Sequence, residues 1–150
     1  MTLSLEEIKS AERAMDEVRA SLAAMGREIY QMRNGDEIGC QYGFHGYFLQ
    51  TYEGSHYVGQ DGPNWGIGTP IVSLTYYWSR ACKEEIVTFP QSYLGEDWRT
   101  LEQTRIDQER QALADAQAQI TEDAARQKEI SERCAYKRLH AKYGGTDGMK

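Results

Sequence analysis

Residues 3–35 read LSLEEIKSAERAMDEVRASLAAMGREIYQMRNG and set the architecture. Apolar residues recur in this segment at alternating spacings of three and four, which predicts a helix with a heptad seam. Ser4 and Glu7 match a capping box that starts the helix, and Asn34-Gly35 supplies the stop. Because the seam is narrow, we expect it to pack on another long helix. The seam consists of Ile8, Ala11, Met15, Val18, Leu22, Met25, Ile29 and Met32.

A second long helix is predicted at the other end of the chain, over residues 96–143. No proline or glycine interrupts this segment, and it is rich in the good helix formers Ala, Gln, Glu and Arg. Its seam is less apolar than the first, with Ile106, Leu113, Ile120, Gln127, Cys134 and Ala141 at intervals of seven. Gly144-Gly145 ends the helix, and residues 144–150 form a loose tail.

The middle of the chain, residues 35–95, has a different character. Nine of the 14 glycines lie between Gly35 and Gly68, and ten of the 16 aromatic residues lie between Tyr42 and Trp78. Alternation of side-chain types predicts strands near residues 38–45 and 71–78, and a third over 85–89 that Pro90 ends. Turns are expected near residues 53–56 and in a long loop over 61–70.

These three segments predict an α+β fold. We expect the long N- and C-terminal helices to pack as an antiparallel coiled-coil-like stalk that flanks a small antiparallel β-sheet. The segments are the N-terminal helix over 1–34, the sheet over 35–95, the C-terminal helix over 96–143 and the tail, all in one structural unit. The unequal helix lengths and the spare apolar stripe favour a homo-oligomer. The alternative is a compact α+β monomer with a broken last helix.

Composition excludes several classes of protein. The 150 residues carry 23 acidic and 17 basic side chains, hence a net charge of −6. This length suits one domain with a modest core, and 40% hydrophobic residues with only 3 prolines argue against disorder. We find no apolar run of about 18 residues that would span a membrane and no signal peptide at the start. An acidic chain is also a poor general binder of nucleic-acid backbone.

Metal and catalytic motifs are missing from the sequence. The candidate metal ligands show no zinc-site spacing; they are Cys40, His45, His56, Cys82, Cys134 and His140. Three widely spaced cysteines indicate free thiols in a reducing cytoplasm. Cys40 and His45 would point to opposite faces of a strand, which argues against a nucleophile–base pair. Since HExxH, GxSxG and P-loop patterns are also lacking, we expect neither an enzyme nor a cofactor.

Charge and aromatic residues coincide in the middle segment. Residues 35–95 contain 6 acids and only 2 bases, Arg80 and Lys83, and so carry −4 of the net −6. Exposed Tyr and Trp side chains serve protein interfaces and also stack on nucleobases. The alternative is that a small sheet needs large side chains for its core. Four basic residues lie near the end of the last helix: Arg133, Lys137, Arg138 and Lys142. They either stabilise the helix C-terminus, where cations are favourable, or form part of a phosphate site.

Two stretches of the second half resemble small proteins of tailed bacteriophages. One is the aromatic strand Tyr76-Tyr77-Trp78 followed by residues 84–94, EEIVTFPQSYL, with an FPxxYL-type turn. The other is residues 136–143, YKRLHAKY, with a Tyr-x-Arg-Leu-x-x-Lys-type ending to a charged helix. The resemblance covers roughly the second half of the chain and brings no functional residues with it.

A phage source implies a non-enzymatic protein that counters a host defence in the host cytoplasm. By analogy of architecture with signal-sequestering sponges, we expect it to bind a nucleotide immune signal. Aromatic rings would stack on the base, and basic side chains, some from a neighbouring subunit, would meet the phosphates. The candidate residues are Trp65, Tyr76 and Trp78 for the base and Arg80, Lys83, Arg133 and Arg138 for the phosphates. The alternatives are direct binding of a host defence protein and a structural coiled-coil assembly role.

Overall fold

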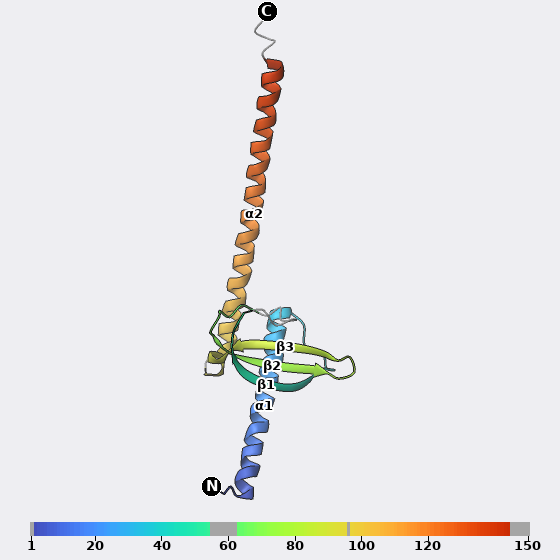
Figure 1. Ribbon diagram of the computed structural model, residues 1–150, viewed down its shortest axis with the longest axis vertical. Helices are drawn as coiled ribbons and strands as arrows, with labels where there is room; N and C mark the ends of the chain where they lie inside the picture. The colour runs from blue at the N-terminus through green and yellow to red at the C-terminus, as the bar shows by residue number, and fades with distance from the viewer. Residues whose placement is uncertain (1, 55–62, 96, 145–150) are drawn as a thin grey trace, which may run out of the picture. The chain divides into compact units, whose positions relative to one another are not determined.

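The computed structural model describes residues 2–54, 63–95 and 97–144. Its elements follow the order α1 (Leu5–Asn34), β1 (Gly43–Thr51), β2 (Pro70–Trp78), β3 (Lys83–Pro90), the 3₁₀ helix η1 (Gln91–Gly95) and α2 (Trp98–Tyr143), as Figure 1 shows. The chain divides into two compact units, residues 1–104 and 105–150. The fold is therefore α+β, with two helices flanking a small sheet in the order of the chain.

The ends of α1 are set by local side-chain and backbone contacts. The Ser4 amide donates to Glu7 Oε2 at 2.7 Å, and the Glu7 amide donates to Ser4 Oγ at 3.2 Å, which completes the capping box. At the other end Gly35 adopts a left-handed conformation with φ 78°, which glycine adopts without a steric penalty. Both predicted ends of this helix are confirmed.

The sheet has three antiparallel strands in the order β1-β2-β3. In the register Leu74 lies opposite Tyr47 of β1 and Val87 of β3, so β2 is the central strand. The predicted second and third strands are confirmed within two residues at each end. The predicted turn at 53–56 and the loop at 61–70 fall partly outside the described residues, and 63–69 lies in a loop or turn.

The first strand begins later than the alternation at residues 38–45 predicted. Residues 38–42 precede β1, and the carbonyl groups of Ile38 and Tyr42 accept from a helix side chain, while that of Gly39 accepts from the Tyr42 amide. Arg27 donates to the Tyr42 carbonyl at 2.6 Å and to the Ile38 carbonyl at 3.4 Å. Ile38 itself is buried in the core. The segment is therefore a loop that packs on α1, and its apolar residues do not belong to a strand.

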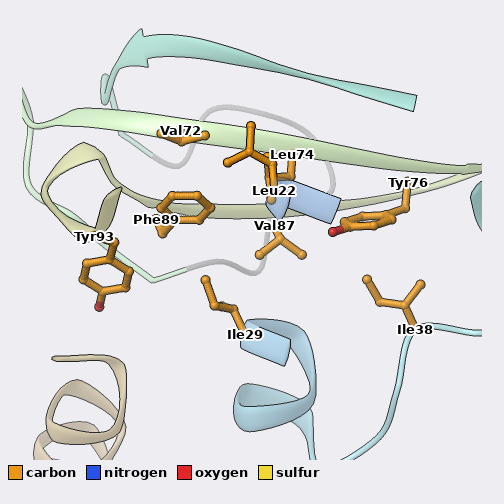
Figure 2. Packing of buried hydrophobic residues seen from close by; sticks show 9 residues of the cluster. All are labelled: Leu22, Ile29, Ile38, Val72, Leu74, Tyr76, Val87, Phe89 and Tyr93. Atoms are coloured by element: carbon orange, nitrogen blue, oxygen red, sulfur yellow. The ribbon is translucent and has the colours of Figure 1, made fainter. Parts of the chain in front are cut away.

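The core lies between α1 and one face of the sheet. Leu22 and Ile29 of α1 pack with alternate residues of β2 and β3, as Figure 2 shows. The sheet members are Val72, Leu74, Tyr76, Val87 and Phe89, and Tyr93 of η1 extends the cluster. The helix comes close at Gly26, where a Cβ atom would lie 2.5 Å from Leu74 Cδ1 and would also clash with the Tyr76 hydroxyl. Glycine at this position permits the close approach.

The heptad seam of α1 has two different surroundings. In its C-terminal half Leu22 and Ile29 are covered by the sheet, although the seam predicted a helical partner. In its N-terminal half the apolar side chains stay exposed, Ile8 at 41%, Met15 at 63% and Val18 at 49%, as does Leu5 beside the seam, at 66%. The antiparallel pairing of the two long helices stays a prediction.

Helix α2 is continuous over 46 residues and begins two residues after the predicted start. From Asp107 to the end of the described part, every residue is exposed. Four ion pairs at i,i+4 spacing stabilise it: Arg105–Glu109, Glu122–Arg126, Lys128–Glu132 and Glu129–Arg133. Within the described residues, neither helix has a stretch apolar and long enough to cross a membrane.

Candidate functional site

The first unit contains an open groove of about 660 Å³. One wall is the middle of α1, and the other combines η1 with the first turn of α2. Its volume falls within the range of roughly 300–1,000 Å³ that small-ligand and side-chain pockets occupy. The groove is therefore large enough to receive several side chains of a partner.

The floor of the groove is apolar. Val18, Leu22 and Met25 contribute from α1, and Leu94 and Trp98 face them from η1 and α2. Leu94 is 54% exposed although it directly follows the core residue Tyr93. Solvent-exposed apolar groups that gather in a concave surface are typical of a docking site.

Its rim carries one ion pair that joins α1 to α2. Arg99 donates to both carboxylate oxygens of Glu28, at 2.6 and 2.9 Å, and its guanidinium lies 4.6 Å from the centre of the Trp98 ring. The hydrogen bond from Arg99 lowers the pKa of Glu28 below its ordinary value of 4.5. The charged form of this carboxylate is thus favoured at neutral pH.

Comparisons with protein-family models, curated proteins and solved structures find no match for this chain. Any function is therefore inferred from the shape and chemistry of the protein's surfaces.

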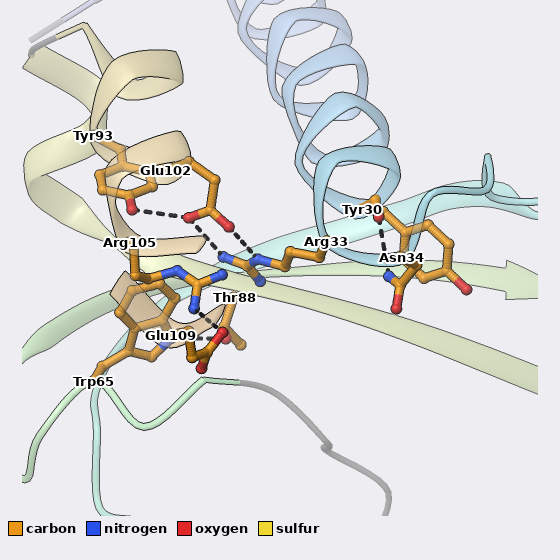
Figure 3. Close-up of polar contacts among 9 residues, drawn as sticks. All are labelled: Tyr30, Arg33, Asn34, Trp65, Thr88, Tyr93, Glu102, Arg105 and Glu109. Atoms are coloured by element: carbon orange, nitrogen blue, oxygen red, sulfur yellow. Dashed lines mark hydrogen bonds and ion pairs between the residues drawn. The ribbon is translucent and has the colours of Figure 1, made fainter. Parts of the chain in front are cut away.

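A buried polar cluster supports the wall that η1 and α2 form. Glu102 is completely buried and accepts from Arg33 Nε at 2.6 Å and from the Tyr93 hydroxyl at 2.9 Å. Figure 3 shows these side chains converging from α1, η1 and α2. A buried carboxylate is tolerated only when it is paired and hydrogen-bonded, as here. The cluster fixes the start of α2 against α1.

Trp65, a predicted base-stacking residue, belongs to the same region. Its indole nitrogen donates to Thr88 Oγ1 at 3.0 Å, and the Arg33 guanidinium lies 5.3 Å from its ring centre. Its edge also meets the Tyr93 ring, with the centroids 6.2 Å apart. The Arg33 guanidinium thus already lies over the half-buried Trp65 ring, where a base would stack.

Tyr76, the second predicted stacking residue, is a core residue. It has no exposed surface, and its hydroxyl donates to the Ala23 carbonyl at 2.7 Å. Burial raises its pKa to about 12. The Arg27 guanidinium lies over its ring and Phe44 makes an edge-to-face contact with it, so stacking on a ligand would require the core to open.

The structure does bring three of the predicted residues together at the β2–β3 hairpin. Trp78 lies opposite Lys83 in the register, and Arg80 occupies the connection between the strands. The Trp78 ring is half-buried and meets the edge of Tyr42, whereas Arg80 and Lys83 are exposed. This hairpin is the part of the predicted nucleotide site that keeps aromatic and basic groups close.

The remaining predicted residues, Arg133 and Arg138, lie in the second unit. Both are exposed on α2, and Arg133 pairs with Glu129 at 2.9 Å. Within the first unit itself, therefore, the basic groups of the predicted phosphate site are Arg80 and Lys83 alone.

The candidate metal ligands do not gather. Among residues 2–54, 63–95 and 97–144, no three His, Cys, Asp or Glu side chains are grouped as a metal site requires. Cys40, Cys82 and Cys134 are free thiols, and all three are exposed. His56 lies outside the described residues.

The groove was missed at the level of sequence. Its α1 wall was identified as a seam, but the facing residues Leu94, Trp98 and Arg99 carry no periodic signal. The FPxxYL stretch did hold part of the information. Phe89 and Tyr93 stack with their ring centres 6.0 Å apart, and this stacking accompanies the placement of Leu94 in the groove wall.

Proposed function

We propose that the protein is a non-enzymatic binding protein that recognises other protein surfaces and self-associates through the first half of α1. The observation that carries this proposal is the row of exposed apolar side chains at heptad spacing, Ile8, Met15 and Val18, with Leu5 beside it, which leads into the groove. Heptad rows of this kind are buried against a second helix in stable proteins. This contact differs from the antiparallel stalk predicted from sequence, which paired the N-terminal helix with the C-terminal helix.

The magnitude of the available burial supports a contact that includes the groove. Burying a large apolar side chain completely contributes about 1.5–3 kcal/mol. Leu5 and the seam residues Ile8, Met15 and Val18 are each about half exposed, so they would contribute roughly 3–6 kcal/mol per chain, or roughly 6–12 kcal/mol for a pair of chains. Association itself costs on the order of 4–15 kcal/mol. The gain along the seam is thus comparable with the cost of association, and contacts in the groove add to it.

Sedimentation or light scattering of purified protein tests this proposal. We expect a mass that is a multiple of the 17.1 kDa chain. Met15→Glu combined with Val18→Glu places charges on the seam and should give a monomer with unchanged circular dichroism in the sheet region. Ala20→Glu, on the opposite side of the same helix, is the matched control and should leave the mass unchanged. A monomeric wild-type protein at high micromolar concentration would contradict the proposal.

A second candidate is sequestration of a nucleotide immune signal in a phage-infected host, as the resemblance to phage proteins implies. The specific observation in its favour is the β2–β3 hairpin, where Arg80 and Lys83 accompany the half-buried Trp78. Thermal shift with cyclic dinucleotides and ADP-ribose-type nucleotides tests it. A shift that Arg80→Ala with Lys83→Ala abolishes would support this candidate, and no shift for any nucleotide would eliminate it.

Direct binding of a host defence protein is compatible with the first proposal. The groove, together with the exposed strand residues Tyr47, Phe48 and Leu49, would then serve a foreign partner as well as a second copy. Recovery of one host protein at fixed stoichiometry, lost in the seam variant, would favour this form of the function.

A further inference from the structure

We propose that the groove receives the N-terminal turns of α1 from a second copy, and that the two α1 helices run antiparallel. This inference rests on the proposed self-association and adds the occupant and its register. The starting observation is continuity, because Val18, Leu22 and Met25 belong both to the seam and to the groove floor. A helix that follows the exposed seam is thereby guided into the groove.

Heptad geometry selects the register. The seam has residues 8, 15, 22 and 29 at one core position and residues 11, 18, 25 and 32 at the other. In an antiparallel pair these two kinds of position face each other. If Met15 faces Val18 of the second copy, Ile8 lies level with the half-buried Met25, and Ala11 lies level with Leu22, which the sheet already covers. One register thus uses the exposed seam and the groove together.

The groove supplies the contacts that the seam alone lacks. In this register the first turns of the second α1 reach Leu94 and Trp98, beside Met25. Leu94 and the incoming Leu5 are both more than half exposed in the single chain. Their mutual burial would give each copy two additional apolar contacts, and the two-fold axis repeats them.

Charges beside the seam favour the antiparallel direction. In this register Glu12 of one copy lies beside Arg19 of the other, and symmetry makes the pair occur twice. Arg19 is held against β1 by a 3.3 Å hydrogen bond that it donates to the His45 carbonyl, and its guanidinium lies 5.4 Å from the Phe44 ring centre. By the same geometry Glu7 lies beside Glu28 of the other copy, whose charge is paired with the 62% exposed Arg99. A parallel pair would instead place Glu7 beside Glu12 twice.

The small residues between the two helices also fit this direction. Ala14 of one copy would flank Ser21 of the other, and both residues line the groove. Small side chains at flanking positions let helices approach without losing contact between the seam residues. The antiparallel register therefore matches apolar, charged and small positions at once.

Disulfide trapping tests the register in the full chain, with Cys40, Cys82 and Cys134 replaced by serine. Two single variants, Ile8→Cys and Met25→Cys, are mixed and oxidised. We expect one covalent dimer that contains one chain of each variant. Each variant alone should not cross-link, because equal positions lie about 25 Å apart along the axis in this register.

The outcomes separate this inference from the proposal on which it depends. Cross-linking of Ile8→Cys with itself would establish a parallel pair, and a dimer by sedimentation with no cross-link in the mixture would establish another interface. Either result overturns the inference and leaves self-association intact. A monomeric wild-type protein removes both.

The groove is tested separately by one charged substitution. Leu94→Glu should weaken self-association at least tenfold, because it introduces a carboxylate where Leu5 of the second copy is placed. Ile67→Glu is the matched control, since Ile67 is 84% exposed and does not line the groove. Equal association of the two variants, each with wild-type circular dichroism, would overturn the proposed occupant.

Discussion

At the scale of single residues, Glu102 holds three elements together. It is a charged side chain without exposed surface, and it accepts hydrogen bonds from Arg33 of α1 and Tyr93 of η1. Arg33 is nearly buried as well, with 13% of its side chain exposed. Removing one partner of such a pair leaves the other charge desolvated and uncompensated.

We therefore expect Glu102→Ala to lower the free energy of unfolding by about 3–5 kcal/mol in urea denaturation. Combining it with Arg33→Met should recover part of the loss, because no unpaired charge then stays buried. The exposed pair at the groove rim is the control, and Glu28→Ala should cost less than about 1 kcal/mol. Equal losses for Glu102→Ala and Glu28→Ala would show that burial does not distinguish the two pairs.

At the scale of elements, the two halves of α1 differ in what stabilises them. Residues near Leu22 and Ile29 are packed on the sheet, whereas those from Leu5 to Val18 have only the capping box and exposed side chains. A helical segment of this length without packing is marginally stable in water. Its order should therefore depend on association.

Hydrogen exchange measures this dependence. In the associated wild-type protein, amides 8–18 should exchange at least tenfold more slowly than in the Met15→Glu, Val18→Glu variant. Amides 26–33 should keep the same protection in both, because the sheet covers that half. Slow exchange of amides 8–18 in the monomeric variant would show that the first half is stable alone.

How far the sequence predicts these elements depends on the range of the interactions. The ends of α1 are predictable because Ser4, Glu7 and Gly35 act within one turn. The predicted start of β1 was wrong because a distant side chain, Arg27, donates to the carbonyl groups of Ile38 and Tyr42. A heptad pattern identifies the apolar face of a helix but not its partner, so the sheet was not expected over Leu22 and Ile29.

For the candidate site too, the sequence predicts local features and misses contacts between distant residues. Tyr76 and Trp78 are aromatic residues two positions apart on one strand, so the sequence pattern does not separate them. Tyr76 is nevertheless buried under α1, whereas Trp78 is half-buried beside the hairpin. The groove needs Leu94 and Arg99 to face α1 across about 70 residues of chain. Such tertiary proximity leaves no periodic trace in one sequence.

At the scale of the whole molecule, ionisable groups bound the pH range of stability. Hydrogen bonds hold the pKa values of Glu7, Glu28 and Asp97 below their ordinary values, from Ser4, Arg99 and Thr100 respectively. These contributions are present above the ordinary pKa values of 4.5 and 3.8 and are lost as the pH falls. Burial acts in the opposite direction on Tyr76, whose pKa is about 12. Its contribution is complete below the ordinary value of 10.0 and is lost as the pH rises.

Urea unfolding should accordingly give a plateau of stability between about pH 5 and 9, with losses on both sides. Tyr76→Phe should lower the plateau by roughly 0.5–1.5 kcal/mol, the net value of one hydrogen bond, and flatten the alkaline side. Tyr47→Phe, at an exposed position, should leave the alkaline slope unchanged. An unaltered slope in Tyr76→Phe would assign the alkaline loss to other groups.

The two ion pairs between α1 and the start of α2 have a mechanical consequence. Arg99 and Glu102 lie on adjacent turns of one helix, and they are fastened to Glu28 and Arg33 on another. In one pair α1 supplies the acid, Glu28, and in the other it supplies the base, Arg33. If one helix slid past the other until Arg99 met Arg33, or Glu102 met Glu28, like charges would face each other. A force applied along α2 would therefore load both ion pairs in shear and pass through them into α1.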